Sequence, residues 1–250
     1  MIAGLIVGYL VLYIKKIKVP KAIQPLMPIM IIPITATLII AFLFIFVIGA
    51  PISGLMKLLF GFLTDLSGGS IIILGLVVGL MQGFDMGGPV SKVVFLFSVG
   101  LIADGQTQFM GAQACAIPVA PLGMALATMI GRKYFDKESV ANGKSALAMG
   151  LVGISEGAIP FAASDPLSVI PANMIGSAVA STLAFSFGIT DNVAHGGPIV
   201  VLLGAVNKPI LAIICMLAGT IVTAIVALFL KATFSRRSEK RELKKMDVAN

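Results

Sequence analysis

The chain of 250 residues contains few charged side chains, no tryptophan, two cysteines and a single histidine. Asp, Glu, Lys and Arg make up only 12% of it, whereas an average soluble domain is about a quarter charged. So little charge cannot cover the surface of a soluble globule of this size, and the composition also excludes disordered, collagen-like and coiled-coil chains. Hydrophobic residues account for 58% of the chain and the mean hydropathy is +1.06, which indicates an integral membrane protein.

The scarcity of cysteine and histidine argues against metal or redox chemistry. Cys115 and Cys215 lie in apolar surroundings without the spacing of a metal or redox pair, which is typical of small buried residues. His195 has no second histidine and no cysteine pair to complete a site, so we expect no metal centre and no cofactor. Residues 153–157 match the letters G-x-S-x-G of serine hydrolases by chance, because the strand–turn–helix context is missing.

The net charge of +7 is concentrated in three basic clusters that lie beside apolar runs and hold 15 of the 18 Lys and Arg residues. They are Lys15, Lys16, Lys18 and Lys21; Arg132, Lys133, Lys137 and Lys144; and Lys231, Arg236, Arg237, Lys240, Arg241, Lys244 and Lys245. The positive-inside rule predicts such clusters in cytoplasmic loops, which argues against nucleic acid as a partner. We therefore expect the loop 15–27 and the C-terminus to lie in the cytoplasm.

The apolar runs differ in length, and a helix needs roughly 20 apolar residues to cross a bilayer. Runs that are long enough lie at 29–48, 110–130, 167–189 and 208–230. Runs that are too short lie at 71–84, 93–103, 145–154 and 196–206. Short apolar segments broken by Gly, Pro and an acidic residue are typical of re-entrant or discontinuous helices. The sequence therefore predicts an all-α integral membrane protein, a polytopic helical bundle with re-entrant or discontinuous helices.

Acidic side chains outside the basic clusters are candidates for function, because an ionisable group inside a membrane is costly. They are Asp65, Asp85, Asp104, Glu156, Asp165 and Asp191. Asp65, Asp104 and Asp191 are predicted to be solvated loop charges. Asp85 and Lys92 flank a Gly-Gly-Pro turn, where a structural pair that closes the turn and a functional role both remain open.

Glu156 and His195 are the strongest candidates for substrate binding. Small residues flank Glu156 and let backbone or a ligand approach its carboxylate, which can accept two hydrogen bonds from sugar hydroxyls. A buried structural carboxylate is the alternative. His195 stands before Gly196-Gly197 at the start of a short apolar run, and its neutral imidazole offers one donor and one acceptor that could orient a polyol. A structural histidine is the alternative there.

Four stretches of the chain resemble the membrane domain, enzyme IIC, of the fructose family of the bacterial phosphoenolpyruvate-dependent sugar phosphotransferase system. They are 83–92 (GFDMGGPVSK), 118–127 (PVAPLGMALA), 153–171 (GISEGAIPFAASDPLSVIP) and 195–197 (HGG). Their order and spacing agree with the family over nearly the whole chain, and the third stretch is highly specific. Two positions depart from the family pattern: Ala194 stands where Pro is usual, and Ser91 where Asn is frequent.

The resemblance implies a dimeric permease of the bacterial cytoplasmic membrane that binds sugar from outside. The sugar is then phosphorylated at the cytoplasmic face by a phosphorylated IIB partner, itself supplied by IIA. The family's sugar-binding acid falls on Glu156 and its histidine on His195. The full set of expected substrate-binding residues is Glu156, His195, Gly157, Gly196, Gly197 and Asp85. The chain carries no phosphocysteine or phosphohistidine motif of the IIB or IIA type, so no catalytic residue is assigned.

The resemblance also sets the expected domain boundaries. We predict an enzyme IIC-like membrane domain over 1–231, without the family's first helices, and a basic cytoplasmic tail over 232–250. Two other classes of function stay open. An ion-coupled secondary transporter would use Glu156 or Asp85 as a proton or sodium site, and a structural membrane protein would need neither Glu156 nor interrupted helices. The sequence does not identify the sugar.

Overall fold

The computed structural model describes residues 2–16, 27–48 and 70–249, together with the separate positions 51, 54, 57, 58, 61, 62 and 65. The chain divides into two compact units, Met1–Leu58 and Leu59–Asn250, each of which is described by itself. Regular structure in the described residues is helical, apart from an isolated antiparallel bridge between Asp191 and Val206. The all-α class predicted from the sequence is confirmed. Most of the loop 15–27 and of the stretch 51–70 lies outside the described residues.

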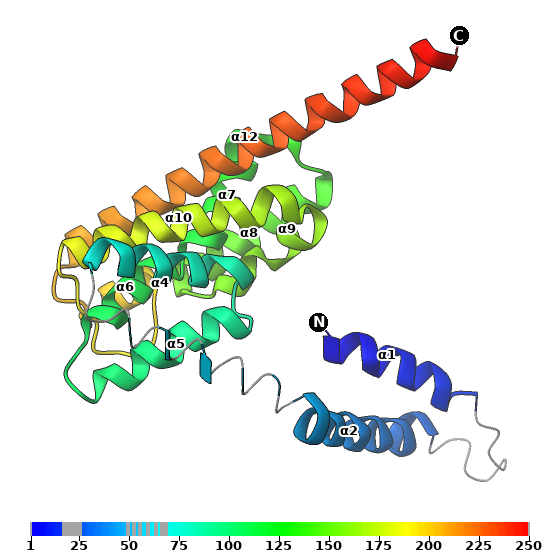
Figure 1. The fold of residues 1–250 in the computed structure, drawn as a ribbon, viewed down its shortest axis with the longest axis horizontal. Coiled ribbons are helices and arrows are strands. Elements are labelled where there is room, and N and C mark those ends of the chain that lie inside the picture. Colours follow the sequence, from blue (N-terminus) through cyan, green and yellow to red (C-terminus); the bar gives the residue numbers. More distant parts are fainter. Residues whose placement is uncertain are drawn as a thin grey trace. The chain divides into compact units, whose positions relative to one another are not determined.

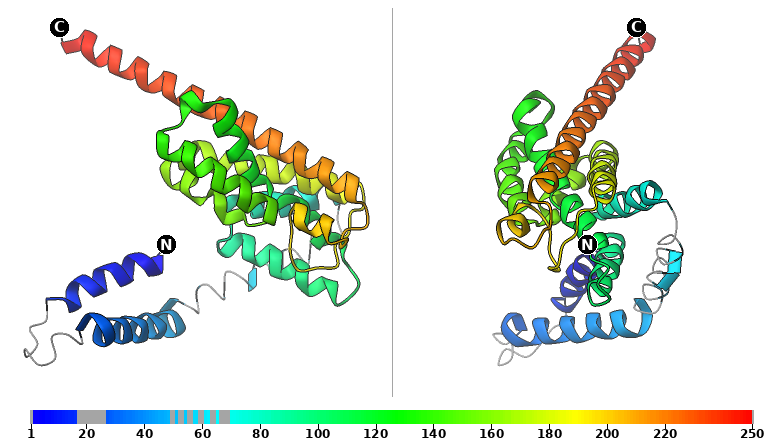
Figure 2. Two further views of the ribbon diagram at one scale, coloured as in Figure 1. Left: turned by 180° about the vertical axis from the view of Figure 1, so that it is seen from behind. Right: turned by 90° about the vertical axis from the view of Figure 1, so that its left-hand side faces the viewer.

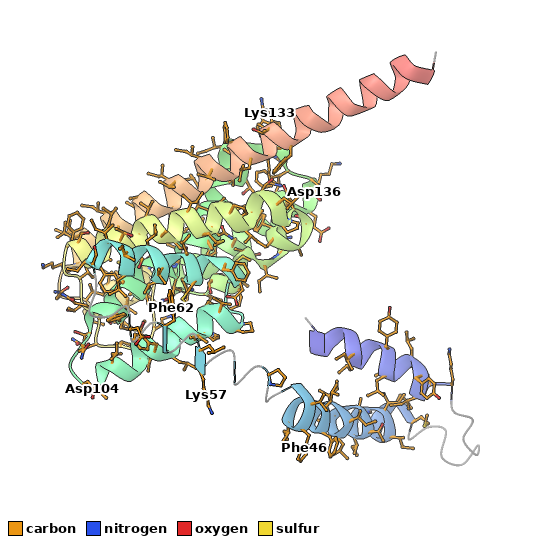
Figure 3. The ribbon with its side chains drawn as sticks, in the orientation of Figure 1. Phe46, Lys57, Phe62, Asp104, Lys133 and Asp136 are labelled. Carbon is orange, nitrogen blue, oxygen red and sulfur yellow. The ribbon has the colours of Figure 1, made fainter. Side chains whose placement is uncertain are left out.

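In the first unit, the structure describes two continuous stretches, 2–16 and 27–48, and both are mainly helical. Helix α1 (Ile2–Ile14) packs against α2 (Ile32–Leu43), which is flanked by the π-helical turns η1 (Met27–Ile31) and η2 (Phe44–Ile48). The run predicted to span at 29–48 forms an apolar helix over Ile32–Val47 that is shorter than the spans of the second unit. Large apolar side chains are exposed along it, Phe46 among them (Figure 3), as expected of helices that face lipid.

The described residues from 70 onward belong to the second unit and form a series of helices. In chain order these are α4 (Ile71–Asp85), α5 (Pro89–Ile102), α6 (Gln108–Ala116), α7 (Val119–Ile130), η3 (Arg132–Tyr134), α8 (Lys137–Val152), η4 (Ser155–Ala158), α9 (Ile159–Ser164), α10 (Pro166–Ser186), α11 (Pro198–Leu202) and α12 (Pro209–Ala249). Three stretches are long and apolar enough to cross a membrane, namely Gln108–Ile130, Pro166–Ser186 and Pro209–Phe234. They coincide with three of the predicted spans. Helix α12 continues past residue 231, where we placed the start of the tail.

Helix α10 is the centre of this unit, with α4 and α12 packed along it (Figures 1 and 2). Glycines recur at every fourth position of α4, at Gly75, Gly79 and Gly83, so they lie on one face of the helix. A Cβ at any of them would overlap the backbone of α10. Gly176 of α10 and Gly219 of α12 allow the same close approach on the other side. Membrane helices associate through such small residues, because lipid removes the hydrophobic driving force between helices.

Two breaks between helices of the second unit fall at Pro or Gly, and the first of them lies inside the run 110–130 that was predicted as one span. Pro118 separates α6 from α7 within one span, and α8 ends at Gly153, whose φ of 85° is left-handed. Helix α8 is longer than the apolar run 145–154, because Asp136 caps it by accepting a hydrogen bond from the Ser139 N–H at 2.7 Å. Asp165 caps α10 in the same way, through the Ser168 N–H at 3.2 Å.

Two loops mark the two ends of this unit. Asp104, in the loop between α5 and α6, and Lys133, just after α7, lie at opposite ends in Figure 3. This placement agrees with a single crossing by Gln108–Ile130 between them.

Candidate functional site

A cavity of about 340 Å³ lies where the interrupted segments of the second unit meet. Its walls come from α4, the start of α5, the break between α6 and α7, the segment after α8 and the loop before α11. The lining residues are Gln82, Gly87, Ser91, Lys92, Phe95, Ile117, Gly153, Ile154, Ser155, Glu156 and His195. The two strongest candidates from the sequence, Glu156 and His195, are therefore brought to one cavity.

Glu156 and Lys92 face each other across this cavity. The Lys92 Nζ lies 3.8 Å from Glu156 Oε1, and the two side chains keep 53% and 43% of their surface exposed. A charge-assisted hydrogen bond between such groups spans about 2.7–2.9 Å, so the pair is an open one. The Ser155 hydroxyl donates to Glu156 Oε2 over 3.5 Å, which is also long. The carboxylate thus keeps hydrogen-bonding capacity for a ligand.

The turn between α4 and α5 brings its backbone against Glu156. Met86 and Gly87 both have positive φ, at 48° and 101°, and a Cβ at Gly87 would overlap the Glu156 carboxylate. The Gly87 N–H donates to the Ser91 hydroxyl at 2.9 Å, which holds the turn. Only glycine combines this backbone conformation with so close an approach to a side chain.

Asp85 caps α5 and does not pair with Lys92. Its carboxylate accepts from the Val90 N–H at 2.6 Å and from the Ser91 N–H at 3.0 Å. Of the two readings left open for Asp85 and Lys92, the pairing of the two side chains is not found: Asp85 closes the turn through backbone groups, and the lysine faces Glu156. A carboxylate at a helix N-terminus is also stabilised by the helix dipole.

His195 is tied to the end of α8. Its Nε2 lies 2.7 Å from the Val152 carbonyl oxygen. Because a carbonyl can only accept a hydrogen bond, Nε2 is the donor, and in the neutral ring Nδ1 is left as an acceptor. This contact fixes the tautomer of a side chain that lines the cavity.

The glycines predicted to bind substrate do not line the cavity themselves, but Gly153, which contacts Gly196, does. A Cβ at Gly153 would overlap the Gly196 carbonyl oxygen, and the Gly197 N–H donates to the Ala114 carbonyl at 2.8 Å. Gly157 is buried beside Met149. The cavity wall that the described residues form thus lacks four of the predicted binding residues, namely Gly157, Gly196, Gly197 and Asp85. Their direct contact with substrate stays a prediction.

Sequence reasoning missed several lining residues. Gln82 is the polar residue inside the otherwise apolar run 71–84, and that isolation was a usable signal. Lys92 is likewise the single charged residue of α5, but it was considered only as a possible partner of Asp85. Phe95 and Ile117 had no signal at all, because apolar residues in a membrane protein are unremarkable without tertiary contacts.

Asp191 departs from its predicted environment. It was expected to be solvated, but it is fully buried, and its Oδ1 accepts from the Val193 N–H at 2.9 Å. Its own N–H donates to the Thr107 carbonyl at 3.2 Å, next to the bridge with Val206. The prediction of a solvated loop charge was therefore wrong for Asp191, whereas Asp104 is exposed as expected.

Cys115 and Cys215 are both buried free thiols, as the apolar context predicted. Within the described residues, the acidic, histidine and cysteine side chains form no group of three or more that could hold a metal ion.

The sequence of the chain is similar to a family of known proteins. The family described as "Phosphotransferase system, EIIC" matches residues 1–176. "Fructose-like permease IIC component 2" of Escherichia coli is 42% identical over 248 residues, which are 99% of this chain and 68% of that protein. No solved structure matches the chain.

Two further relatives are longer proteins. The "PTS system fructose-specific EIIB'BC component" of Escherichia coli is 39% identical over 217 residues, 86% of this chain and 38% of that protein. The "PTS system fructose-specific EIIABC component" of Bacillus subtilis is 37% identical over 221 residues, 88% of this chain and 34% of that protein. The chain spans little more than a third of either. With its apolar spans, its interrupted helices and these matches, the chain belongs to the EIIC family of the phosphotransferase system, a family of multi-pass membrane proteins.

Proposed function

We propose that this chain is the permease component of a phosphotransferase system and carries fructose or a fructose-like sugar across the membrane. The observation that carries the proposal is a cavity lined by a carboxylate, an ammonium group and an imidazole together. The names of the relatives, fructose-like or fructose-specific, support the choice of sugar.

The cavity suits a sugar in size and chemistry. Its volume of about 340 Å³ falls within the roughly 300–1,000 Å³ of ordinary small-molecule sites. Glu156 accepts from hydroxyls, Lys92 donates to them, and His195 Nδ1 accepts one more. Phe95 and Ile117 supply apolar surface for the C–H faces of the ring.

The phosphoryl group is proposed to come from a IIB partner that is supplied in turn by IIA. Relatives whose names combine EIIB or EIIA with EIIC support this pairing. His195 is proposed to orient the sugar and to carry no phosphate: its Nε2 donates to the Val152 carbonyl, which directs Nδ1 to accept from a sugar hydroxyl. Incubation with phosphorylated IIB and labelled phosphate, without sugar, tests this: acid-labile label on His195 would contradict it.

The C-terminus is proposed to lie in the cytoplasm. Lys133 of the second basic cluster and Lys231 of the third line one cavity together with Asp165, so these two clusters share a face of the unit. The positive-inside rule makes that face cytoplasmic. A cysteine introduced by Ser238→Cys should react with an impermeant thiol reagent only in inverted vesicles; the native cysteines are buried and give little background. Labelling in intact cells would reverse the topology.

The chain is also proposed to act as a homodimer in contact with lipid. Exposed apolar side chains on the first unit and on α12, such as Phe42 and Phe229, provide surface for either contact. The mass of the protein–detergent particle, measured by light scattering, tests the dimer.

The transport experiment uses the protein in liposomes with labelled fructose. Phosphorylated IIB should be required for accumulation, and labelled fructose phosphate should appear. An uncoupler should have no effect. Uptake that needs no phosphoryl donor and collapses with an uncoupler would instead support an ion-coupled transporter that uses the open carboxylate of Glu156.

A further inference from the structure

Gln82 is a buried amide on the wall of the substrate cavity. It lies in the last turn of α4 and only 4% of its surface is exposed, yet it lines the cavity that Glu156 and His195 share. Its Oε1 is shielded from solvent and has no hydrogen-bond partner among the residues that the structure describes. The role of this residue follows neither from the sequence motifs nor from the ion pair at Glu156.

An amide oxygen in such a place is unfavourable without a partner. Most buried polar side-chain atoms in native proteins are hydrogen-bonded, and an unsatisfied one has to be explained. An apolar residue of the same size would avoid the cost altogether, because it brings no polar atom into the bundle. The polar residue at position 82 therefore indicates a partner that arrives with the ligand.

The backbone at Gln82 is held firmly. The next residue, Gly83, packs directly against the α10 backbone at Asn173, and Met81 is buried too. A side chain on so fixed a segment samples few positions, so its amide is pre-organised toward the cavity that it lines. Pre-organised polar groups of this kind distinguish between ligands that differ by one hydroxyl, because the wrong ligand leaves the group unpaired.

We propose that Gln82 binds one hydroxyl of the sugar and thereby determines which sugars the permease accepts. The proposal rests on the proposed sugar permease function. A sugar hydroxyl both donates and accepts, so it can donate to Oε1 or accept from Nε2 of the same amide. Gln82 adds a polar group on the wall formed by α4 to those that Glu156, Lys92 and His195 supply from other walls of the cavity.

Gln82→Met tests the proposal, because methionine keeps the unbranched shape and removes the amide. Isothermal titration of fructose should show an affinity about 3- to 10-fold weaker, the usual range for one neutral hydrogen bond. The melting temperature of the sugar-free protein should stay the same or rise, since an unsatisfied polar group is removed. If the role of Gln82 were purely structural, the variant would instead have a lower melting temperature and an unchanged affinity for fructose. Gln82→Leu repeats the test if the methionine variant fails to fold.

Gln113→Met is the matched control. Gln113 in α6 is also fully buried and neither atom of its amide has a partner among the described residues, but it does not line the cavity. Its replacement should leave the fructose affinity unchanged. Equal losses in both variants would show a general effect of buried amides and overturn the proposal.

A series of deoxyfructoses then identifies the hydroxyl. The analogue that lacks this hydroxyl should bind the wild type more weakly than fructose does. The same analogue and fructose should bind Gln82→Met equally well, because the hydrogen bond between the hydroxyl and Gln82 is already absent from that variant. Additive losses for every analogue would overturn the proposal. A wild-type protein that binds neither fructose nor any related sugar would contradict the proposed function itself, which separates the two failures.

Discussion

Two carboxylates of the second unit each face a lysine, and their surroundings differ. Asp165 is 2.7 Å from Lys231 Nζ and also accepts from the Ser168 N–H. Glu156 is 3.8 Å from Lys92 Nζ. The side chains of the first pair are 29% and 11% exposed, whereas those of the second are 43% and 53% exposed. The Asp165 pair is closed and the Glu156 pair is open.

The difference separates a structural ion pair from a binding group. Asp165 caps α10 while Lys231 joins α12 to the same point and lies over the Phe135 ring at 4.7 Å. These contacts occupy both groups, and they lock the ends of two helices together. Glu156 has no comparable set of short contacts, so its carboxylate stays available to accept hydrogen bonds from a ligand. The two acid–lysine pairs of this unit thus have different roles, because they differ in the distance between their charges and in their burial.

The largest expected effect is the loss of sugar binding in Glu156→Gln. A hydrogen bond to a charged group contributes roughly 1.5–3 kcal/mol, so the affinity for fructose should fall about 10- to 150-fold. The melting temperature should hardly change, because the carboxylate makes no short contact in the sugar-free protein. Isothermal titration measures the affinity, with Asp165→Asn as the control that should bind normally. Unchanged affinity in a folded variant would remove Glu156 from the site.

Asp165→Asn should act on stability instead. Loss of one partner from the closed pair should lower the free energy of unfolding by about 1–2 kcal/mol, less than for a fully buried pair because Asp165 keeps some exposure. Lys231→Met should have a similar effect, and the double variant should lose less than the sum. Thermal melting in detergent measures all three. Additive losses would show that the two side chains do not interact.

The closed pair should also confer a pH dependence. Burial raises the pKa of Asp165, but the hydrogen bonds from Lys231 and Ser168 outweigh it and hold the pKa below its ordinary value of 3.8. The stabilisation by the charged carboxylate is therefore complete above that ordinary value and is lost as the pH falls through the lowered one. The difference in melting temperature between wild type and Asp165→Asn should be constant near neutral pH and shrink in acid. A difference that grows in acid would contradict the direction.

The smallest effect is expected for Lys92→Met on stability. An exposed ion pair contributes about 0–1 kcal/mol, so the melting temperature should fall far less than in Lys231→Met. Both substitutions remove a lysine that faces a carboxylate, and only the closed pair should respond strongly. Equal destabilisation by the two variants would mean that the open and closed pairs do not differ energetically.

Sequence reasoning predicted the membrane class, three of the spans and some of the interruptions correctly, because hydropathy and the positions of Gly and Pro are local properties. Gly153 ends α8 in a left-handed conformation that its own lack of a side chain permits, whereas the break at Pro118, inside the run 110–130, was not predicted. The family was recognisable from stretches around Glu156 and His195 for the same reason.

Contacts between distant segments could not be predicted in the same way. A pair with Asp85, seven positions away in the sequence, was one of two alternatives for Lys92, but Asp85 accepts from the N–H groups of α5 and the lysine faces Glu156. Asp191 was expected in solvent but is buried, and its backbone forms the isolated bridge with Val206, 15 positions further along the chain.

The sequence alone determined that this chain folds in a membrane, because a chain with only 12% charged residues cannot cover a folded surface in water. It also determined where helices break and which acid and histidine are candidates. Tertiary structure decided which charges meet, and how closely. Glycines of α4 let it lie directly against α10, and that packing, together with the turn at Gly87, places Gln82 and Lys92 on the cavity beside Glu156. The physical reason is that the energy of an ion pair or an amide depends on distance and burial, and neither is a property of one segment alone.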